Sequence, residues 1–413
     1  MNDKIHHAIL QNMDSLCNWF ETEAQKVFIP FYSSYDIRDS SFKVTNVDAN
    51  IYPAGFNNIC PTDKEHSPDL AQSYFNTYYP GAKKILLITE DHLKNMYYWE
   101  NVNAIQALLT TAGFDVRIGM PVLAEQATME FETYLGNKVL AHRVFNKDGK
   151  LITEGFIPDV VISNNDFSKT YEAWTDLSKT PMTPPMELGW YQRQKSIYFE
   201  CYNNTAAEFA QLLKMDPWFF QVRTELFSEF DVSDEQSRIR LAKVADDMLL
   251  KLQQDYSERG ISEKPYLFIK NNSGTYGLGV IRVAAGEDIL KWTYDSRKKM
   301  KAQKGGGRFD EVIVQEGVPT VMKSGAATAE PTIYMVGDSL AGGFLRTHEQ
   351  KDEKDSLNSP GAVYKKLCLS DLKIKAEGCP LENVYGWVGK IGLLAIGRET
   401  QKMNIKYHGY HSK

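Results

Sequence analysis

The stretch YLFIKNNSGTYGLGVIRV, residues 266–283, decides the fold. An apolar run ends at Lys270, a glycine-rich segment follows, and a second apolar run begins directly after Gly279. Two short apolar runs separated by a loop with glycine are typical of a β-hairpin. The loop is not a Walker motif, because no Gly-Lys-Ser/Thr opens a helix, and the Gly-x-Gly-x-x-Gly dinucleotide pattern is missing too. The sequence therefore predicts a strand, a glycine loop and a second strand.

The tip of this hairpin is suited to bind phosphate. Glycine removes side chains from the tip, so backbone N–H groups can approach phosphate oxygens closely, and Lys270 supplies a compact positive charge. The residues expected to make this contact are Lys270, Ser273, Gly274, Thr275, Tyr276, Gly277 and Gly279. A glycine-rich hairpin with a solvated lysine is the alternative, and the glycine spacing alone does not decide between the two.

Four further segments downstream carry polar residues next to apolar strands. FDEVIVQEG, residues 309–317, ends in Gln315 and Glu316, which could face an adenine edge. Glu330 begins the next strand, Arg346 lies in GGFLRTH, and Asn358 lies in DSLNSPGAV. Carboxylate and amide oxygens are ligands of the kind that hold Mg²⁺ beside nucleotide phosphates. An arginine nearby suits a substrate carboxylate or a transferring phosphoryl group.

The part of the chain before these motifs predicts an α/β fold. KKILLIT at 83–89 is a continuous apolar strand, residues 96–113 keep apolar residues at helical spacing, and FDVRIG at 114–119 is the next strand. A strand, a helix and a strand in this order imply a parallel pair, and open α/β sheets bind ligands at the carboxyl ends of their strands. An amphipathic helix is expected over residues 4–27.

Polar residues in the first half of the chain are candidates for substrate or metal binding. Asp48 and Asn50 lie on one face of a predicted strand, and Asp48 could complete a metal site. The other candidates follow a turn, end an apolar strand or lie in WYQRQK: Asn57, Asn58, Asn164, Asn165, Asp166, Arg193 and Lys195. Each residue could instead have a structural role only, because asparagine side chains often form hydrogen bonds with the backbone of turns and charged stretches are often exposed to solvent.

Composition excludes several classes of protein. The net charge of −6 argues against a broad grip on nucleic acid phosphates. The N-terminus lacks the basic start and apolar stretch of a signal peptide, and no run of about 18 apolar residues predicts a membrane span. Five cysteines without a Cys-x-x-Cys pair indicate reduced thiols rather than a disulfide scaffold or zinc site. A cytoplasmic protein is expected.

In this order, the motifs resemble the ATP-grasp fold: a glycine hairpin with a lysine, a strand with a glutamate, an acidic strand, then an arginine and an asparagine. IKNNSGTYGLGVIRV, NVDANIYPAGFNN, ELGWYQRQKSIYF and LNSPG together resemble the ATP-grasp type of bacterial glutamate–cysteine ligase, over roughly residues 40 to 370. The resemblance implies an ATP- and Mg²⁺-dependent ligase that joins the glutamate γ-carboxylate to the cysteine amine through a γ-glutamyl phosphate, the first step of glutathione biosynthesis.

The resemblance also implies roles and a division of the chain. Lys270 and Arg346 are expected to be catalytic, Gln315 and Glu316 to bind ATP with the hairpin, and Glu330, Asn358 and Asp48 to hold the metal. The partners are then small molecules (glutamate, cysteine and ATP) rather than nucleic acid or membrane, and the oligomeric state is left open. The expected parts are an N-terminal α/β, pre-ATP-grasp-like substrate domain (1–185), a helical connection (186–260) and an ATP-grasp region (261–413).

One departure from the family pattern keeps alternatives open. The family loop begins Lys-Ala-Asp-Ala-Gly-Thr-Tyr-Gly, whereas Asn271, Asn272 and Ser273 follow Lys270 here, so an amide replaces an acid. The alternatives are another ATP-grasp carboxylate–amine ligase, such as a glutathione synthetase or a dipeptide ligase, and a nucleotide-binding sensor without catalysis.

Overall fold

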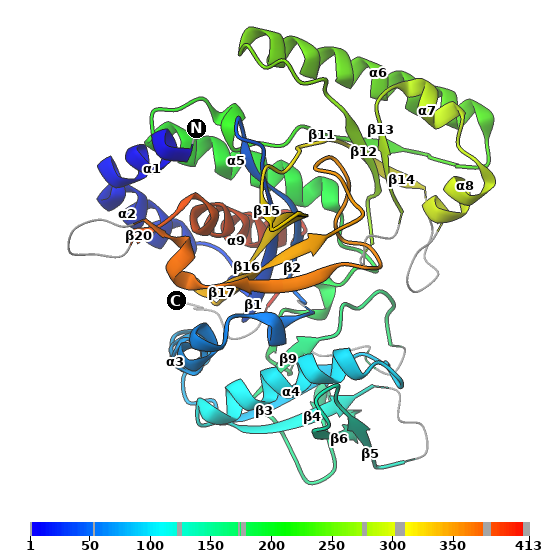
Figure 1. Cartoon of the computed structure of the whole chain (residues 1–413). Coiled ribbons are helices and arrows are strands. Elements are labelled where there is room, and N and C mark those ends of the chain that lie inside the picture. The colour runs from blue at the N-terminus through cyan, green and yellow to red at the C-terminus, as the bar shows by residue number, and fades with distance from the viewer. Residues whose placement is uncertain are drawn as a thin grey trace.

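The computed structural model describes residues 2–52, 54–121, 126–171, 174, 179–274, 279–301, 310–374 and 381–407. Within these ranges the chain forms three larger sheets and two small two-stranded ribbons (Figure 1). No helix in the described ranges is long and apolar enough to cross a membrane.

The central sheet joins the two ends of the chain. Its strands run in the order β18 (Val363–Leu367), β17 (Ser339–His348), β16 (Ala327–Val336), β1 (Tyr32–Asp39) and β2 (Val44–Asn50), and β15 (Lys323–Ser324) also pairs with β16. All of these pairs are antiparallel. An N-terminal hairpin thus completes a sheet whose other strands come from the C-terminal part.

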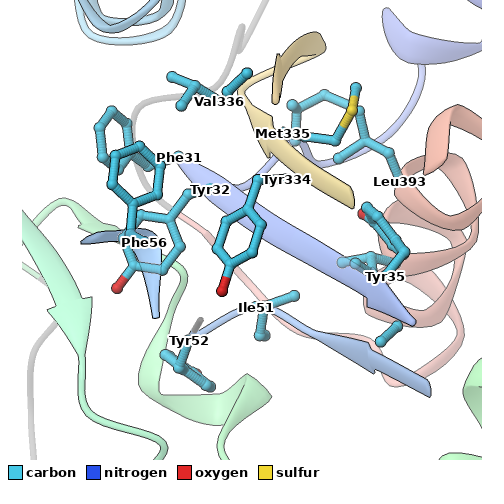
Figure 2. Packing of buried hydrophobic residues seen from close by; sticks show 14 of the residues in the cluster. Phe31, Tyr32, Tyr35, Ile51, Tyr52, Phe56, Tyr334, Met335, Val336 and Leu393 are labelled. Carbon is cyan, nitrogen blue, oxygen red and sulfur yellow. The ribbon is translucent and has the colours of Figure 1, made fainter. Parts of the chain in front are cut away.

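Side chains alternate across the central sheet because successive residues of a strand point to opposite faces. One face packs against α9 (Val384–Lys402), which itself packs against α5 (Lys195–Leu212), α1 (Asn2–Gln11) and α2 (Met13–Ala24). Figure 2 shows Tyr35 beside Leu393 of α9, and Tyr334 with its hydroxyl directed toward Ile51 and Tyr52. The face opposite α9 carries polar residues such as Asp36 beside the aromatic rings of Tyr334 and Phe344, and α3 (Pro61–Tyr78) also packs against β16 and β17.

A separate α/β unit lies at the lower end of the molecule in Figure 1. Its strands run β10 (Met182–Thr183), β9 (Val160–Asn164), β3 (Lys84–Thr89), β4 (Asp115–Met120), β6 (Lys138–Arg143) and β5 (Thr128–Glu132). All pairs except β5–β6 are parallel. The helices α3 (Pro61–Tyr78) and α4 (Met96–Thr111) belong to this region. The predicted strand, helix and parallel strand over 83–119 are confirmed.

The third sheet belongs to a smaller lobe with a core of its own. Its order is β11 (Thr224–Ser228), β14 (Glu311–Glu316), β12 (Leu267–Asn271) and β13 (Val280–Val283). An apolar cluster joins it to α6 (Glu235–Glu258), with α7 (Gly286–Leu290) and α8 (Tyr294–Lys301) alongside. Strands β12 and β13 pair antiparallel, so the predicted hairpin over 266–283 is confirmed.

Short elements complete the chain. The two ribbons pair β7 (Phe145–Lys147) with β8 (Lys150–Ile152) and β19 (Lys373–Ile374) with β20 (Leu381–Glu382). Single 3-10 turns lie at Phe56–Asn58, Met186–Leu188, Pro217–Phe219 and Leu369–Leu372.

Two expectations need correction. The division into 1–185, 186–260 and 261–413 does not follow the sheets, because β1 and β2 pair within the C-terminal sheet and α6 packs in the small lobe. The single helix expected over 4–27 is two helices, α1 and α2, which meet at Asn12. In both cases hydrophobic periodicity identified elements but could not tell which distant surface each element packs against.

The contact between α9 and the central sheet predicts different effects of alanine substitutions at two glycines of α9. A Cβ at Gly392 would lie 2.5 Å from the buried Tyr35 ring, whereas a Cβ at Gly389 would find nothing nearer than 3.4 Å. We expect Gly392→Ala to lower the free energy of unfolding by about 1–3 kcal/mol through overpacking. Gly389→Ala is the matched control and should be neutral or stabilising by up to about 1 kcal/mol, because alanine favours the helix. Urea denaturation measures both, and equal effects would contradict the packing described.

Candidate active site

A pocket lined by β12, β13 and β14 of the small lobe and by β1, β2 and β16 of the central sheet lies between them, and we call it the hairpin pocket. It holds about 680 Å³ of empty space, part of it open to solvent. Its apolar wall contains Val47, Phe268, Val280 and Val318. Its polar wall consists of Asp36, Arg38, Asp48, Lys195, Lys270, Asn271, Gln315, Glu316, Glu330, Ser356 and Asn358, with Gly274 at the hairpin.

A second pocket, the tyrosine pocket, adjoins the first on the face of the central sheet opposite α9. It is lined by Ser34, Asp36, Asn50, Tyr52, Ala54, Asp166, Trp190, Thr332, Tyr334, Phe344, Arg346, Asn358 and Tyr364. Asp36 and Asn358 line both pockets. The two spaces therefore meet at these two side chains.

Four buried charged residues form the floor between the pockets, and we call them the ion network. Glu330 and Arg346 are directly opposite each other on β16 and β17, and their side chains bond at 2.7 Å. Arg346 also donates to both oxygens of Asp36, at 2.7 and 3.1 Å. Arg38 donates from Nε to Glu330 at 2.6 Å. The charges of the two arginines and the two carboxylates sum to zero, so the network as a whole is neutral.

Burial and ion pairing act in opposite directions on Asp36 and Arg346. Burial raises the pKa of Asp36 above its ordinary value, although the positive charge of Arg346 opposes the shift. The two carboxylates in turn raise the pKa of Arg346 against the effect of its burial. Breaking such a buried pair on one side leaves an uncompensated charge, which typically costs 3–5 kcal/mol. The network therefore holds its geometry rigidly at the junction of the two pockets.

Lys270 differs from the other cations of the hairpin pocket. Its ammonium donates to the Val47 carbonyl at 3.0 Å and to the Gln315 side-chain oxygen at 2.6 Å. Both partners are neutral, whereas Arg38 and Lys195 each bond a carboxylate. Burial lowers the pKa of Lys270 to about 8, despite the opposing charge of Asp48. Among the described residues that line this pocket, Lys270 is the cation without a bonded carboxylate, which suits it to a bound anion.

Two other carboxylates of the hairpin pocket are already paired. Lys195 bonds Asp48 at 2.5 Å. Burial alone would raise the pKa of Asp48, but the positive charges of Lys195 and Lys270 outweigh burial and lower it. Lys43 bonds Glu316 at 2.6 Å with both side chains only 1% exposed. The predicted contact between the Glu316 side chain and an adenine edge is therefore not favoured, because its carboxylate is held by Lys43.

The amide that replaces an acid in the hairpin has a structural explanation. Asn272 donates from Nδ2 to Glu311 at 2.8 Å and accepts at Oδ1 from the Ser196 N–H. An aspartate in this position would face the Glu311 carboxylate and could not donate to it. Asn272 thus ties the hairpin to β14 and to the start of α5, a role that requires an amide.

The structure brings most of the predicted site residues to the two pockets. The hairpin pocket contains Asp48, Lys195, Lys270, Gly274, Gln315, Glu316, Glu330 and Asn358. The tyrosine pocket contains Asn50, Asp166, Arg346 and again Asn358. Thr275, Tyr276 and Gly277 lie outside the described residues. Ser273 donates to the Arg193 carbonyl at 2.9 Å, and Gly279 accepts from the Asn271 N–H at 3.1 Å, so both hold the hairpin in place.

Arg193 lines neither pocket. Its Nε and Nη2 donate to the two carboxylate oxygens of Glu399 on α9, each at 2.9 Å, and both side chains are 1% exposed or less. Its guanidinium also lies 4.9 Å from the Trp190 ring of the tyrosine pocket. The predicted contact of Arg193 with a substrate carboxylate is not supported, because a carboxylate of the chain itself occupies its donors.

The other predicted asparagines serve local structure. Asn164 accepts from the Tyr32 hydroxyl at 3.1 Å, and Asn165 donates to the Thr89 carbonyl at 2.9 Å. Asn57 and Asn58 lie in a 3-10 turn and line neither pocket. Direct binding of substrate by these four residues is not supported. The amides of Asn164 and Asn165 instead bond to groups of the chain itself.

The sequence prediction missed the strand that supplies half of the ion network. Asp36 and Arg38 lie in YSSYDIRD, which is β1, and all of its residues are buried. Two opposite charges spaced two apart within a strand lie on one face, and this was the available signal. It was weak because β1 has few apolar residues. Tyr52 and Tyr334, which line the tyrosine pocket, carry no motif at all.

The donor set of the hairpin pocket fits a divalent cation bound with phosphates. Asp36, Glu330 and Asn358 line it together and offer hard oxygen atoms. No group of three or more histidines, cysteines or acids in the described ranges is arranged to hold a metal ion alone. A cation that takes one or two carboxylates from the protein and the remaining ligands from phosphate and water is compatible with both observations.

Comparison with solved structures gives a strong match over nearly the whole chain. A protein of Methylobacillus flagellatus KT, described as a candidate gamma-glutamylcysteine synthetase, has a crystal structure with 31% sequence identity and a TM-score of 0.87. The match covers 96% of this chain and 95% of that chain. No curated protein sequence matches.

Two more distant structures also match. D-alanyl-alanine synthetase A from Vibrio cholerae O1 biovar eltor str. N16961 has 12% identity and a TM-score of 0.34, covering 79% of this chain and 82% of that chain. A glutathione synthetase-like effector from Globodera pallida has 12% identity and a TM-score of 0.38, covering 88% and 84%. These scores are too low to support an argument about function.

A family model settles the assignment. The model for glutamate-cysteine ligase, GshA, matches residues 6–400, nearly the whole chain. The α/β class is confirmed, and two antiparallel sheets enclose the hairpin pocket as the ATP-grasp fold requires. The chain therefore belongs to the glutamate–cysteine ligase family.

Proposed function

We propose that the hairpin pocket binds ATP, that the tyrosine pocket binds the amino acid that is activated, and that the phosphoryl group is transferred where the pockets meet. The reaction of the family joins the glutamate γ-carboxylate to the cysteine amine and is the first step of glutathione biosynthesis. The proposal concerns which residues of this chain perform each part of it.

The burial and the hydrogen-bond partners of Lys270 give the proposal its main support. It is a buried cation with only neutral hydrogen-bond partners, next to a hairpin whose described end contains Gly274. The Asn271 side-chain nitrogen is also buried here without a hydrogen-bond acceptor. A phosphate group would accept hydrogen bonds from both and would compensate the charge of Lys270.

The walls of the hairpin pocket suit the remainder of a nucleotide. Phe268, Val280 and Val318 give it an apolar side where a planar base would be removed from water. Lys270 and the ion network lie on the polar side. The adenine would therefore lie against the small lobe, and the phosphates would point toward the central sheet.

Residues at the junction have the groups that an acyl-phosphate route needs. Asn358, with Glu330, Asp36 or Asp48 sharing an oxygen that also bonds an arginine or a lysine, would hold Mg²⁺, which spreads the negative charge of the phosphates during transfer. In the tyrosine pocket, the Asp166 carboxylate suits an ammonium group, and the Nε of Arg346, which is buried without a hydrogen-bond acceptor, suits a carboxylate. Tyr52, Tyr334 and Trp190 surround this space with aromatic area that limits water.

The chemistry balances in two steps. A γ-carboxylate oxygen of glutamate bonds to the γ-phosphorus of ATP, and the bond to ADP breaks with Lys270 near the transferring oxygens. The amine of cysteine then bonds to the acyl carbon, phosphate leaves with its electron pair, and the amine releases a proton. Water must be kept from the acyl phosphate between these steps, because hydrolysis would waste the ATP.

The substrate assignment is tested by phosphate release from ATP in the presence of Mg²⁺ and different amino-acid pairs. We expect release with glutamate plus cysteine, and formation of a hydroxamate when hydroxylamine replaces cysteine, because hydroxylamine captures an acyl phosphate. Release only with γ-glutamylcysteine plus glycine, or only with two alanines, would assign another carboxylate–amine ligase. Measurable ATP binding without release under any of these conditions would support a sensor.

Removal of the Lys270 charge should affect catalysis far more than folding. We expect Lys270→Met to lower kcat/KM for ATP by about 100- to 1000-fold, the range typical for loss of one group that stabilises transferring charge. The control is Lys291→Met, whose lysine pairs with Glu287 on α7 and is 67% exposed. It should leave the rate unchanged. Thermal unfolding of both variants verifies the fold, and a near-normal rate for Lys270→Met would remove it from the phosphate site.

The low pKa of Lys270 makes ATP binding depend on pH. With a pKa of about 8, roughly three quarters of Lys270 is neutral at pH 8.5, and bound phosphate favours its charged form. ATP affinity should therefore fall as the pH rises through 8, and binding at pH 8.5 should take up about 0.7 proton per ATP. Calorimetry in buffers of different ionisation enthalpy measures this uptake. Lys270→Arg should abolish the uptake, and an unchanged uptake in that variant would assign it to another group.

A further inference from the structure

Two cysteines far apart in the sequence meet beside the tyrosine pocket. Cys60 precedes α3, and Cys368 follows β18, 308 positions later. Their sulfur atoms lie 2.7 Å apart with no other group between them. Neither the proposed ligase reaction nor the ion network uses these thiols.

The surroundings hold both cysteines in this position. Asp63, in the first turn of α3, accepts a hydrogen bond from the Leu369 N–H at 2.8 Å, so the segment after β18 is tied to the start of the helix. Asp371 accepts from the Cys368 N–H at 2.9 Å. The contact between the sulfurs is therefore supported on both sides by backbone hydrogen bonds.

The two thiols are suited to different steps of an exchange reaction. The Cys368 thiol lowers the pKa of Cys60 by hydrogen bonding, and the N–H groups of Thr62 and Asp63 at the start of α3 add to this effect. The same hydrogen bond raises the pKa of Cys368 to about 11, so the pair holds one proton more readily than two. Cys368 is the more exposed residue, since Cys60 is 3% exposed and Cys368 is of intermediate exposure. Burial instead raises the pKa of Cys17 and Cys201, which favours inert thiols.

We propose that Cys60 and Cys368 are a redox-active dithiol that a low-molecular-weight disulfide, such as cystine or glutathione disulfide, converts to an intramolecular disulfide. The Cys60 thiolate accepts the proton of Cys368 across the 2.7 Å contact, the more accessible Cys368 sulfur attacks the small disulfide, and a mixed disulfide forms as one small thiol leaves with the proton that Cys60 returns. The Cys60 thiolate then attacks the Cys368 sulfur, and the second small thiol leaves. In total the two cysteine thiols are oxidised, one small disulfide is reduced to two thiols, and each sulfur of the pair ends in a bond of about 2.05 Å.

This bond would connect two walls of the tyrosine pocket. The segment before Cys60 carries Ala54, whose carbonyl accepts from the Tyr334 hydroxyl, and the strand before Cys368 carries Tyr364. Ala54, Tyr334 and Tyr364 all line the pocket. The disulfide would fix the start of α3 to the edge strand β18 and close a loop that spans most of the chain. The inference does not depend on the proposed ligase activity.

Peptide mapping of the whole protein tests the proposal. The reduced protein is incubated with cystine, alkylated without reduction and digested. We expect a peptide pair joined through Cys60 and Cys368, an intact mass lower by two hydrogen atoms, and reversal by dithiothreitol. Cys60→Ser should stop the reaction at a mixed disulfide on Cys368, and Cys368→Ser should give neither product. Cys17→Ser is the matched control and should leave the cross-link unchanged.

A stability measurement gives an independent readout. Because the cross-link constrains the unfolded chain, the oxidised protein should unfold at a higher temperature than the reduced protein. This difference should be absent in Cys60→Ser and kept in Cys17→Ser. A cross-link that involves Cys17, Cys201 or Cys379, or mixed disulfides alone in the unsubstituted protein, would overturn the proposal. So would an unchanged unfolding temperature in protein that mapping shows to be fully cross-linked.

Discussion

The pairing of β1 with β16 is the constraint on which the site depends. It places Asp36 and Arg38, from the first tenth of the chain, against Glu330 and Arg346, which lie about three hundred residues later. Each of these charges would be costly to bury alone, and only the complete set balances. A one-residue shift between the two strands would move the charges of β1 to the apolar face of α9. The register of the sheet therefore determines the geometry of the site.

The distribution of charge separates support from chemistry. Charges that bond one another, such as Arg193 with Glu399 or Lys43 with Glu316, fix the positions of strands and helices. Lys270 alone among the described cations lining the hairpin pocket lacks such a partner. A preorganised neutral floor beside one uncompensated cation is well suited to bind a transferring phosphoryl group, because little must rearrange when charge develops.

Local signals in the sequence were sufficient to predict the hairpin and to select Lys270, Glu330 and Arg346, which the structure places at the two pockets, because each lies near the end or the start of an apolar strand. They were insufficient where a residue's role depends on a distant partner. Arg193 has the chemistry of a carboxylate site, yet its carboxylate is Glu399 on the last helix. The domain boundaries failed for the same reason, since nothing in residues 32–50 indicates pairing with residues 327–336. The substrates themselves were identified by family resemblance rather than by residue chemistry.

The arrangement of the central sheet has a consequence for biosynthesis. During translation, β1 and β2 leave the ribosome long before β16 has been synthesised. The helices α1 and α2 pack against α9, which is synthesised later still. The α/β unit of residues 84–183 has all of its strands early and can form while the chain is still growing. In contrast, the side chains of β1 and β2 that pack against α9 stay exposed until almost the whole chain has been synthesised. Slow synthesis or premature termination would therefore expose an aggregation-prone strand edge, and a molecular chaperone that shields it would increase the yield of folded enzyme.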